Sequence, residues 1–233
     1  KGVTYLFNTD NGTLTQKIEY GEVTGSSDGT FSDTGSDLSS TTISYAASST
    51  ANMYLPSVEL TQDQGSSKVR ETKNYYDNQS IGVINSGNLT KKETWKVSSS
   101  YASTTKTYNA YGLVTQEKDG KGNATNYTYD TYNLYPATST NALSHTNAYS
   151  YDYSSGKVKQ LVDQNSRVYQ NTYDGFDRIL EVKQPDLTTP TTLVTKLQYT
   201  YTDNTVPVKI QETVSLSSAT STDKYTYFDG IGR

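Results

Sequence analysis

The chain has 233 residues, of which 19% are charged, and its net charge of −4 excludes the strongly basic surface that tracks nucleic-acid phosphates. It has no cysteine, which excludes a disulfide framework and a thiolate metal site, and no stretch approaches the roughly 20 apolar residues of a membrane-spanning helix. Hydrophobic residues make up only 32%, but there are 22 tyrosines, whose rings can be buried while their hydroxyls keep a hydrogen bond. This composition favours a sheet with one solvated face.

The first 72 residues are expected to be a degenerate repeat region. Phe7 and Asn8 fit a weak first copy of a pattern that becomes clear later in the chain. Residues 24–50 are dominated by Ser, Thr, Gly and Asp and hold few residues that could anchor a core. We therefore expect a long loop or poorly ordered insertion there, with a weak strand at residues 42–45.

A tyrosine followed by an acidic or amide residue recurs along residues 73–233. Tyr129, Tyr151 and Tyr173 each precede an aspartate and are spaced by 22 residues. The other members of the series are Tyr76 with Asp77, Tyr108 with Asn109, Tyr201 with Asp203, and Tyr227 with Asp229. The period predicts an array of similar units. The sequence begins without a methionine and stops just after a turn signal, so we expect the array to continue beyond this piece.

Each copy contains alternating polar and aromatic residues, a turn and a second alternating run. A period of two places Tyr199 and Tyr201 on one face of a strand. Turns are expected at Asp119, Asp174 and Asp229, because the glycine that follows each accepts a positive φ and the aspartate can bind nearby amides. The second strands are expected at residues 113–117, 157–162 and 178–183. The pattern predicts an all-β fold of consecutive antiparallel hairpins, with more than about half of the residues in strands and almost no helix.

The turns resemble the Tyr-Asp-x-x-Gly-Arg signature of YD repeats, also called Rhs repeats. These repeats occur in bacterial Rhs proteins, wall-associated proteins, the B and C components of insecticidal Tc toxins, and the teneurins. The resemblance is carried by residues 173–178 and 227–233 and by the unit at 108–130. It assigns a structural role to the signature positions Tyr76, Asp77, Tyr108, Gly112, Tyr129, Asp130, Tyr151, Asp152, Gly156, Tyr173, Asp174, Arg178, Tyr201, Tyr227, Asp229, Gly232 and Arg233.

Three positions depart from the signature. Asn109 replaces the aspartate, Asp177 stands where glycine is usual, and Asp203 is shifted by one position from the expected place. We expect some turns to be rebuilt there.

In these families the repeats wind as a curved, spiralling sheet into a hollow shell, which in the bacterial toxins encloses a C-terminal toxic polypeptide. The resemblance implies a scaffold segment of a large secreted or cell-surface protein, and not an enzyme. Its candidate partners are the neighbouring repeats of the same parent chain and an enclosed toxin. No cofactor, nucleic-acid partner or membrane span is expected.

Catalytic and metal-binding roles find little support in the sequence. His145 is the single histidine, and it lies beside Ser144 in a polar connection, without the convergent groups that a catalytic site needs. The repeated aspartates could be cation ligands, but with one in each hairpin they suit turn building better. A glycan hydrolase would need two acids about 5 to 9 Å apart, and the sequence offers no such pair.

The tyrosine stripes leave a second function open. Rings with hydroxyl edges also suit an adhesin or stalk that binds glycans or a protein partner through a tyrosine-rich face. The stripes recur in every repeat, whereas a binding patch would be local. We therefore favour cross-strand ladders within a sheet.

Overall fold

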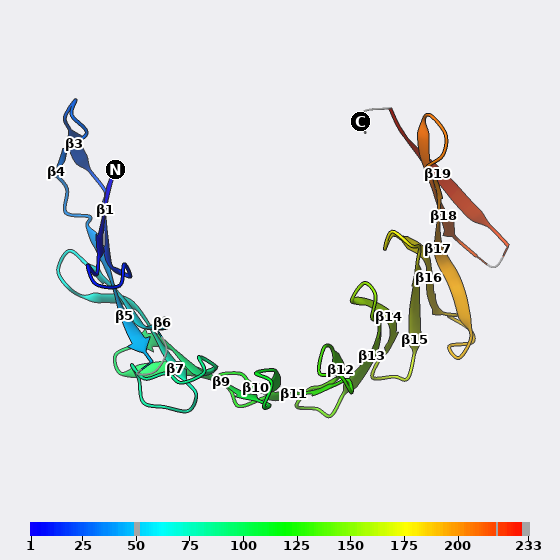
Figure 1. The fold of residues 1–233 in the computed structure, drawn as a ribbon, viewed down its shortest axis with the longest axis horizontal. Coiled ribbons are helices and arrows are strands. Elements are labelled where there is room, and N and C mark those ends of the chain that lie inside the picture. The colour runs from blue at the N-terminus through cyan, green and yellow to red at the C-terminus, as the bar shows by residue number, and fades with distance from the viewer. Residues whose placement is uncertain (49–51, 218, 230–233) are drawn as a thin grey trace. The chain divides into compact units, whose positions relative to one another are not determined.

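The computed structural model describes residues 1–48, 52–217 and 219–229, and these residues form strands and no helix (Figure 1). More than half of them lie in antiparallel strands, so the all-β fold of consecutive hairpins is confirmed. The described part of the chain thus contains no helix that could cross a membrane. The chain divides into two compact units, Lys1–Ala124 and Thr125–Arg233.

The first unit is an antiparallel meander with a small inserted hairpin. Its strands are β1 (Gly2–Phe7), β2 (Leu14–Tyr20), β3 (Val23–Gly25), β4 (Phe31–Asp33), β5 (Ser39–Ala47), β6 (Tyr54–Asp63), β7 (Lys68–Tyr76), β8 (Leu89–Val97), β9 (Ser100–Tyr108) and β10 (Val114–Lys118). β1 pairs with β2, β2 pairs with β5, and each later strand pairs with the next. β3 and β4 pair only with each other among the described residues.

The second unit continues the same plan without an insertion of this kind. Its strands are β11 (Ala124–Tyr129), β12 (Pro136–Thr140), β13 (Thr146–Asp152), β14 (Lys157–Val162), β15 (Val168–Tyr173), β16 (Ile179–Pro185), β17 (Leu193–Thr202), β18 (Val208–Ser215) and β19 (Ser221–Phe228). Every strand pairs antiparallel with the next one. This regularity follows from the alternation of β-branched and aromatic residues with polar ones.

In residues 24–50 the expected strand at 42–45 is present within β5, but the rest is more ordered than the long loop that was expected. Residues 24–50 include β4, the end of β3 and the nine-residue strand β5, while residues 49 and 50 lie outside the described part of the chain. Ser and Thr hydroxyls can link strands, and Thr41 and Thr61 share a 3.0 Å hydrogen bond. The β3–β4 hairpin packs through Phe31, whose ring lies edge-on to the Tyr20 ring at a centroid distance of 5.2 Å. The Phe31 ring also occupies the space that a side chain at Gly2 would fill. Low hydrophobicity therefore did not prevent strand formation here.

The boundary expected at residue 72 between degenerate and regular repeats stays a prediction. Residue 72 lies inside β7, and the pairing of β7 with β6 and β8 continues on both sides of it.

Most strand side chains are half-exposed, as expected for a sheet that no helical layer covers. The buried hydrophobic residues are Ala46, Tyr76 and Ile84, with Met53, Leu55 and Leu89 packed against them. This small core lies where the loop between β7 and β8 folds back toward β5, since the main-chain N–H of Ala47 donates to Gly82 at 3.1 Å. Elsewhere, strand pairing and side-chain contacts across the sheet supply the stability.

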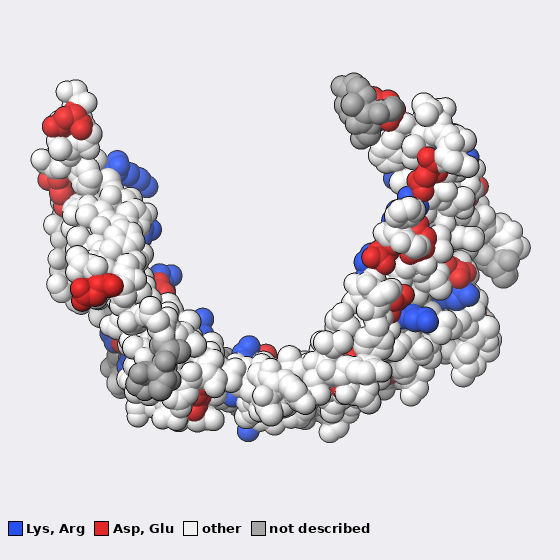
Figure 2. Space-filling model, in the orientation of Figure 1, with Lys and Arg blue, Asp and Glu red and all other residues white. Residues whose placement is uncertain are grey.

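The face of the molecule seen in Figure 2 is mostly uncharged, with acidic and basic side chains interspersed. This agrees with the 19% of charged residues.

Candidate functional site

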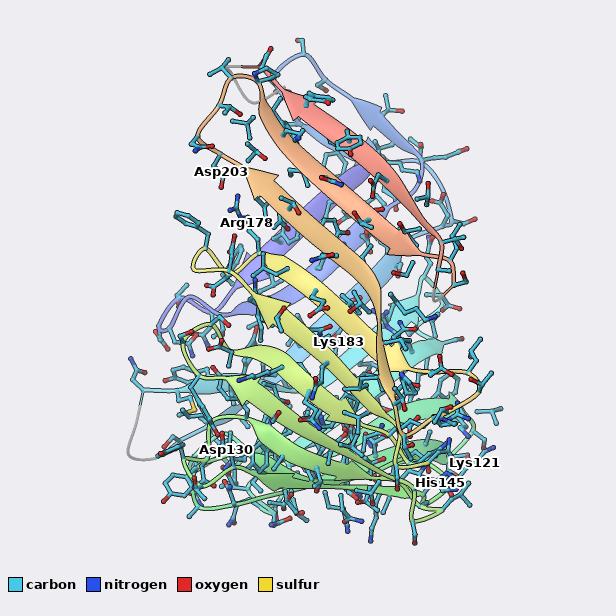
Figure 3. The ribbon with its side chains drawn as sticks, turned by 90° about the vertical axis from the view of Figure 1, so that its right-hand side faces the viewer. Lys121, Asp130, His145, Arg178, Lys183 and Asp203 are labelled. Carbon is cyan, nitrogen blue, oxygen red and sulfur yellow. The ribbon has the colours of Figure 1, made fainter. Side chains whose placement is uncertain are left out.

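The signature residues that the structure describes lie where strands end, at one rim of each unit. Because the strands alternate in direction, the turns after β7 and β9 share a rim of the first unit, and those after β11, β13, β15 and β17 share a rim of the second. We call each of these a signature rim. In Figure 3, Asp130, Arg178 and Asp203 lie at one rim of the second unit, and His145 lies at the other.

The repeat tyrosines of the first unit connect successive hairpins through their hydroxyls. Tyr45 pairs in register with Pro56, and the main-chain oxygen of Pro56 accepts a 2.9 Å hydrogen bond from the Tyr76 hydroxyl. Tyr76 in turn pairs with Leu89, whose oxygen accepts a 2.7 Å bond from Tyr108. Burial raises the pKa of Tyr76 and of Tyr108, so both phenols remain neutral donors. Tyr76 and Tyr108 thus each bond to the residue that pairs with an earlier tyrosine, which is Tyr45 for the first contact and Tyr76 for the second.

The second unit contains the same series. Tyr151 pairs with Val158, and the Val158 oxygen accepts a 2.9 Å hydrogen bond from Tyr173. Tyr173 pairs with Ile179, and the Ile179 oxygen accepts a 2.9 Å bond from Tyr201. The 22-residue tyrosine period in the sequence therefore corresponds to a repeated contact between neighbouring strands.

A register shift lies at several of the tyrosines at or near the end of a strand, although Tyr201 and Tyr227 pair with β18 without one. The shifts lie at Ser44/Tyr45, Tyr75/Tyr76, Thr128/Tyr129, Ser150/Tyr151 and Thr172/Tyr173. A bulge inserts an extra residue and re-aims the side chain next to it. In each case the extra residue lies in the strand that follows the tyrosine, such as Thr90 of β8 opposite Tyr76.

The residue after the tyrosine closes the turn. The side-chain oxygen of Asn109 accepts the N–H groups of Tyr111 at 2.9 Å and Leu113 at 3.0 Å, and Gly112 has a φ of 77°. The carboxylates of Asp130 and Asp174 accept the N–H groups two and four residues on in the same way. The position three residues on also has a positive φ, 53° at Asn133 and 62° at Asp177. The substitutions at 109 and 177 therefore preserve the turn. Of the three departures, only the one at Asp203 has different contacts, since Arg178 binds its carboxylate.

The Asp77 carboxylate stabilises a longer loop, the one between β7 and β8. The carboxylate accepts four main-chain N–H groups at 2.8 to 3.0 Å, from Asn85, Ser86, Gly87 and Asn88. Burial alone would raise the pKa of Asp77, but these donors outweigh it and hold the pKa below its usual range. The loop places Ile84 in the small core, so this signature aspartate links the rim to the packing beneath it.

Gly156 is required by a close approach. It has a φ of 74°, and a Cβ atom there would lie 2.7 Å from the Tyr135 hydroxyl. Its N–H donates to the main-chain oxygen of Asp152 at 2.7 Å. Tyr135 stacks on Tyr151 with a centroid distance of 4.6 Å. The turn after β13 thus joins two tyrosines of neighbouring hairpins.

Arg178 joins two successive turns of the signature rim. Its Nε donates to Asp174 at 2.7 Å, and its two terminal nitrogens donate to the two carboxylate oxygens of Asp203 at 2.9 and 2.7 Å. Its guanidinium lies 3.9 Å from the centre of the Tyr201 ring. The hydrogen bonds from Arg178 lower the pKa of Asp203, and the two carboxylates raise that of Arg178. Asp203 is displaced in the sequence, but it supplies the partner that Arg178 needs.

The remaining signature positions differ in how they are placed. Tyr129 ends β11, and Tyr227 lies exposed in β19, shortly before Asp229. Gly232 and Arg233 lie outside the described residues.

The opposite rim uses the same turn chemistry, which the sequence predicted only at Asp119. The positive φ expected at Gly120 and Gly175 falls instead at Gly122 and Asp177. Asn141 and Asp163 also accept N–H groups two and four residues on, at 2.8 to 3.0 Å. Ser144 and Ser166, three residues on, have positive φ. An aspartate or asparagine three positions before a small polar residue or glycine was the signal that could have found these turns.

A charged cluster in the first unit was also missed. The carboxylate of buried Glu71 in β7 pairs with Lys68 and lies 3.6 Å from the Lys73 ammonium. It also accepts a 2.5 Å hydrogen bond from the Tyr101 hydroxyl of β9, two strands away. Burial would raise the pKa of Glu71, but Lys68 and Tyr101 outweigh it and lower the pKa. The Lys73 ammonium lies 4.6 Å from the Tyr101 ring centre, which adds a cation–π contact.

The signature rim of the first unit contains a polar cleft. A space of about 310 Å³ lies between the turns after β7 and β9, lined by Asp77, Asn78, Asn88, Thr90, Thr107, Tyr108 and Asn109. Among the described residues, no three histidine, aspartate or glutamate side chains are grouped to hold a metal ion. His145 is exposed in its turn, where its main-chain N–H binds Asn141 at 3.0 Å.

Comparison with solved structures finds the same fold in Tc toxins. The complex titled TcdB2-TccC3-Cdc42 superposes with a TM-score of 0.56 at 15% identity, over 94% of this chain and 11% of that one. A Tc holotoxin pore of Photorhabdus luminescens gives 0.56 at 16% identity, over 93% of this chain and 11% of that one. The complex TcdB2-TccC3 gives 0.54 at 15% identity, over 94% of this chain and 12% of that one. No family model matches the chain, and no curated protein matches its sequence.

The chain spans only about a tenth of the length of the proteins it matches. Over that length it has the fold of the Tc-toxin shell, which is built from YD repeats.

Proposed function

We propose, from the premise that the chain has the fold of a YD-repeat shell, that these residues form a section of the wall of a large secreted or cell-surface protein that encloses a toxin polypeptide. The observation that carries the proposal is the series of hydroxyls of Tyr76, Tyr108, Tyr173 and Tyr201, each of which bonds to the strand before it. A contact that repeats in one direction extends a sheet hairpin by hairpin, as a wall requires.

We propose a structural role for the signature side chains because their polar atoms are already engaged. Both oxygens of Asp203 bind Arg178, and Asp174 binds the same guanidinium and two N–H groups. A catalytic acid or base must have an atom free to reach a substrate proton. The neighbouring repeats of the parent chain are the partners that the strand pairing supports.

Enclosure can be tested by chemical access to the two faces of one strand. Lys91 and Lys92 are adjacent in β8, so their side chains leave opposite faces of the sheet. The chain has no cysteine of its own. Single Lys91→Cys and Lys92→Cys variants of the full-length protein therefore report on one face each, provided that its remaining cysteines are replaced.

In a closed wall, a polyethylene-glycol maleimide too large to enter will modify only one of the two variants. After unfolding in denaturant, both should react equally, which is the control for cysteine reactivity. Equal modification of both variants in the folded full-length protein would show that both faces meet solvent and would overturn the enclosure.

An adhesin is the second candidate, and one observation favours it. Tyr132 and Tyr153 are 69% and 53% exposed, and their rings meet edge to face at 5.5 Å on the signature rim of the second unit. This is a local patch of aromatic rings that could stack on a sugar. Glycan-array binding that is lost in the Tyr132→Ala/Tyr153→Ala double variant, and kept when exposed Tyr111 of the first unit is changed to Ala, would support this function. Equal binding by the unmodified protein, the double variant and the Tyr111→Ala variant would show that this patch is not the glycan-binding site.

A further inference from the structure

Tyr132 and Tyr153 are two exposed phenols that lie in contact on the signature rim of the second unit. Tyr132 belongs to the turn after β11 and Tyr153 to the turn after β13, so their contact joins two successive turns of this rim. Their rings meet edge to face, with a centroid distance of 5.5 Å and an interplanar angle of 84°. Because both residues lie in turns and are more than half exposed, a small oxidant can reach them and their rings have room to reorient.

Asp130, which lies at this rim in Figure 3, supplies a proton acceptor for one of the two phenols. The Tyr153 hydroxyl donates a 3.0 Å hydrogen bond to its Oδ2 atom, while its Oδ1 atom accepts the N–H groups of Tyr132 and Leu134. Burial would raise the pKa of Asp130, but the Leu134 N–H and the Tyr153 hydroxyl outweigh it and lower the pKa. The carboxylate is therefore unprotonated at neutral pH. It can take the phenol proton as an electron leaves Tyr153, because a phenol that loses an electron becomes a strong acid.

We propose that Tyr132 and Tyr153 are an oxidative cross-linking site, at which a peroxide-dependent one-electron oxidant such as a haem peroxidase links the two rings while Asp130 accepts the Tyr153 proton. Each phenol loses one electron and its hydroxyl proton. The two phenoxyl radicals couple through the ring carbons next to the hydroxyls, and the hydrogens on those carbons then move to the oxygens. Two tyrosines and one molecule of hydrogen peroxide thus give one dityrosine and two molecules of water.

The product is a covalent link between two successive turns in a chain that has no cysteine. Such a link limits the freedom of the unfolded chain, as a disulfide does. The inference rests on the geometry of these two turns and does not depend on the proposed wall.

Other tyrosines of the chain show why this pair is favoured. Tyr135 and Tyr151 are partly buried and stack at 4.6 Å with an interplanar angle of 20°, so their rings must separate before their edges can bond. Tyr225 and Tyr227 lie near-parallel on one strand, at the longer distance of 6.5 Å. Tyr111 is 73% exposed, but among the described residues its ring contacts no other aromatic ring.

The test treats the full-length protein with hydrogen peroxide and a haem peroxidase and maps the products by mass spectrometry. Protein of monomer mass is isolated first, which removes links between molecules. Cleavage before aspartate then releases residues 130–151 and 152–162 as separate peptides, and Tyr153 is the only tyrosine in the second. A link between Tyr132 and Tyr153 joins these two peptides with the loss of two hydrogens. A link between Tyr135 and Tyr151 stays within the first peptide.

We expect the joined peptides to be the main dityrosine product of residues 1–233. They should disappear in Tyr132→Phe and in Tyr153→Phe, which keep the ring but remove the phenol, and they should persist in the control Tyr111→Phe. Matching circular dichroism spectra will show that the variants fold.

Asp130→Asn tests the proton acceptor. The asparagine at 109 accepts the same two N–H groups of its turn, so this change should preserve the turn while removing the carboxylate. The joined product, whose first peptide then begins at Asp119, should form more slowly. An unchanged rate would overturn the role of Asp130.

A dityrosine that forms mainly between Tyr135 and Tyr151, or between Tyr225 and Tyr227, would overturn the proposal. Joined peptides that survive in Tyr132→Phe would also overturn it, and so would a full-length protein in which these two peptides are never joined. If a variant does not fold, the map of the unmodified protein decides by itself, because the joined peptides are either its main product or they are not.

Discussion

The hydroxyl of Tyr76 donates a 2.9 Å hydrogen bond to the main-chain oxygen of Pro56 on the neighbouring strand. Tyr108 reaches Leu89, and Tyr173 reaches Val158, in the same way. For apolar packing alone, the ring of a phenylalanine would suffice. The repeated hydroxyl contact explains why the repeat uses tyrosine in place of phenylalanine.

Tyr76→Phe should therefore lower the free energy of unfolding by about 1 kcal/mol, because it removes one hydrogen bond while the Pro56 oxygen keeps the Asn74 side-chain amide as a donor. Tyr111 is largely exposed, and Tyr111→Phe should have a much smaller effect. Urea titration of both variants measures the difference. Equal stabilities would mean that the hydroxyl contact is not energetically coupled to folding.

The Asp77 carboxylate, with its four N–H donors, should make stability depend on pH. Its pKa is lowered in the folded state, so its contribution is present above the unfolded-state pKa of about 4 and is lost as the pH falls through the folded-state pKa. Asp77→Asn tolerates the positive φ of this position and should cost about 1 to 3 kcal/mol at pH 7. The gap between wild type and variant should shrink below pH about 4. A gap that stays constant from pH 7 to pH 2 would contradict this explanation.

Arg178 should be irreplaceable by lysine. Lysine keeps the charge but loses the two-pronged contact with Asp203 and the stacking on Tyr201. Arg178→Lys should lower the thermal midpoint, and the loss should diminish when Asp203→Asn is already present, as a double-mutant cycle would show. Arg167, which is exposed, serves as the control for an arginine-to-lysine change. Additive effects at 178 and 203 would show that the two residues are not coupled.

Tyr151 and His145 should differ sharply in their contributions to stability. Tyr151 is half-buried and stacks on Tyr135, so Tyr151→Ala should cost about 2 to 4 kcal/mol. His145 is exposed in a turn, and His145→Ala should be nearly neutral. Denaturant titration that gave the reverse order would show that the repeats are not organised around their tyrosines.

The strands and repeat spacing were predictable because they depend on local sequence. Tyr199 and Tyr201 alternate with polar residues, and their rings are stacked side by side on β17 at 6.1 Å. The hydrogen-bond partners of the tyrosines were not predictable. The Tyr201 hydroxyl binds Ile179, 22 residues away, and that contact depends on the register of two strands and on the bulge at Tyr173.

Two other features were hidden for different physical reasons. The strand expected at residues 42–45 is present, but β5 is longer, because Ser and Thr residues that are typical of loops pair across the sheet through their hydroxyls. The ion cluster at Glu71 was missed because Tyr101 reaches it across β8, a contact that no period of the sequence reveals.

The central claim is that this sheet is part of a shell wall, and cryo-electron microscopy of the full-length protein tests it most directly. The account predicts that residues 1–229 form part of a closed wall, with further strands paired to β1 and β19 and one face of the sheet turned to a hollow interior. A ribbon with solvent on both faces and no strand paired to either β1 or β19 would contradict it.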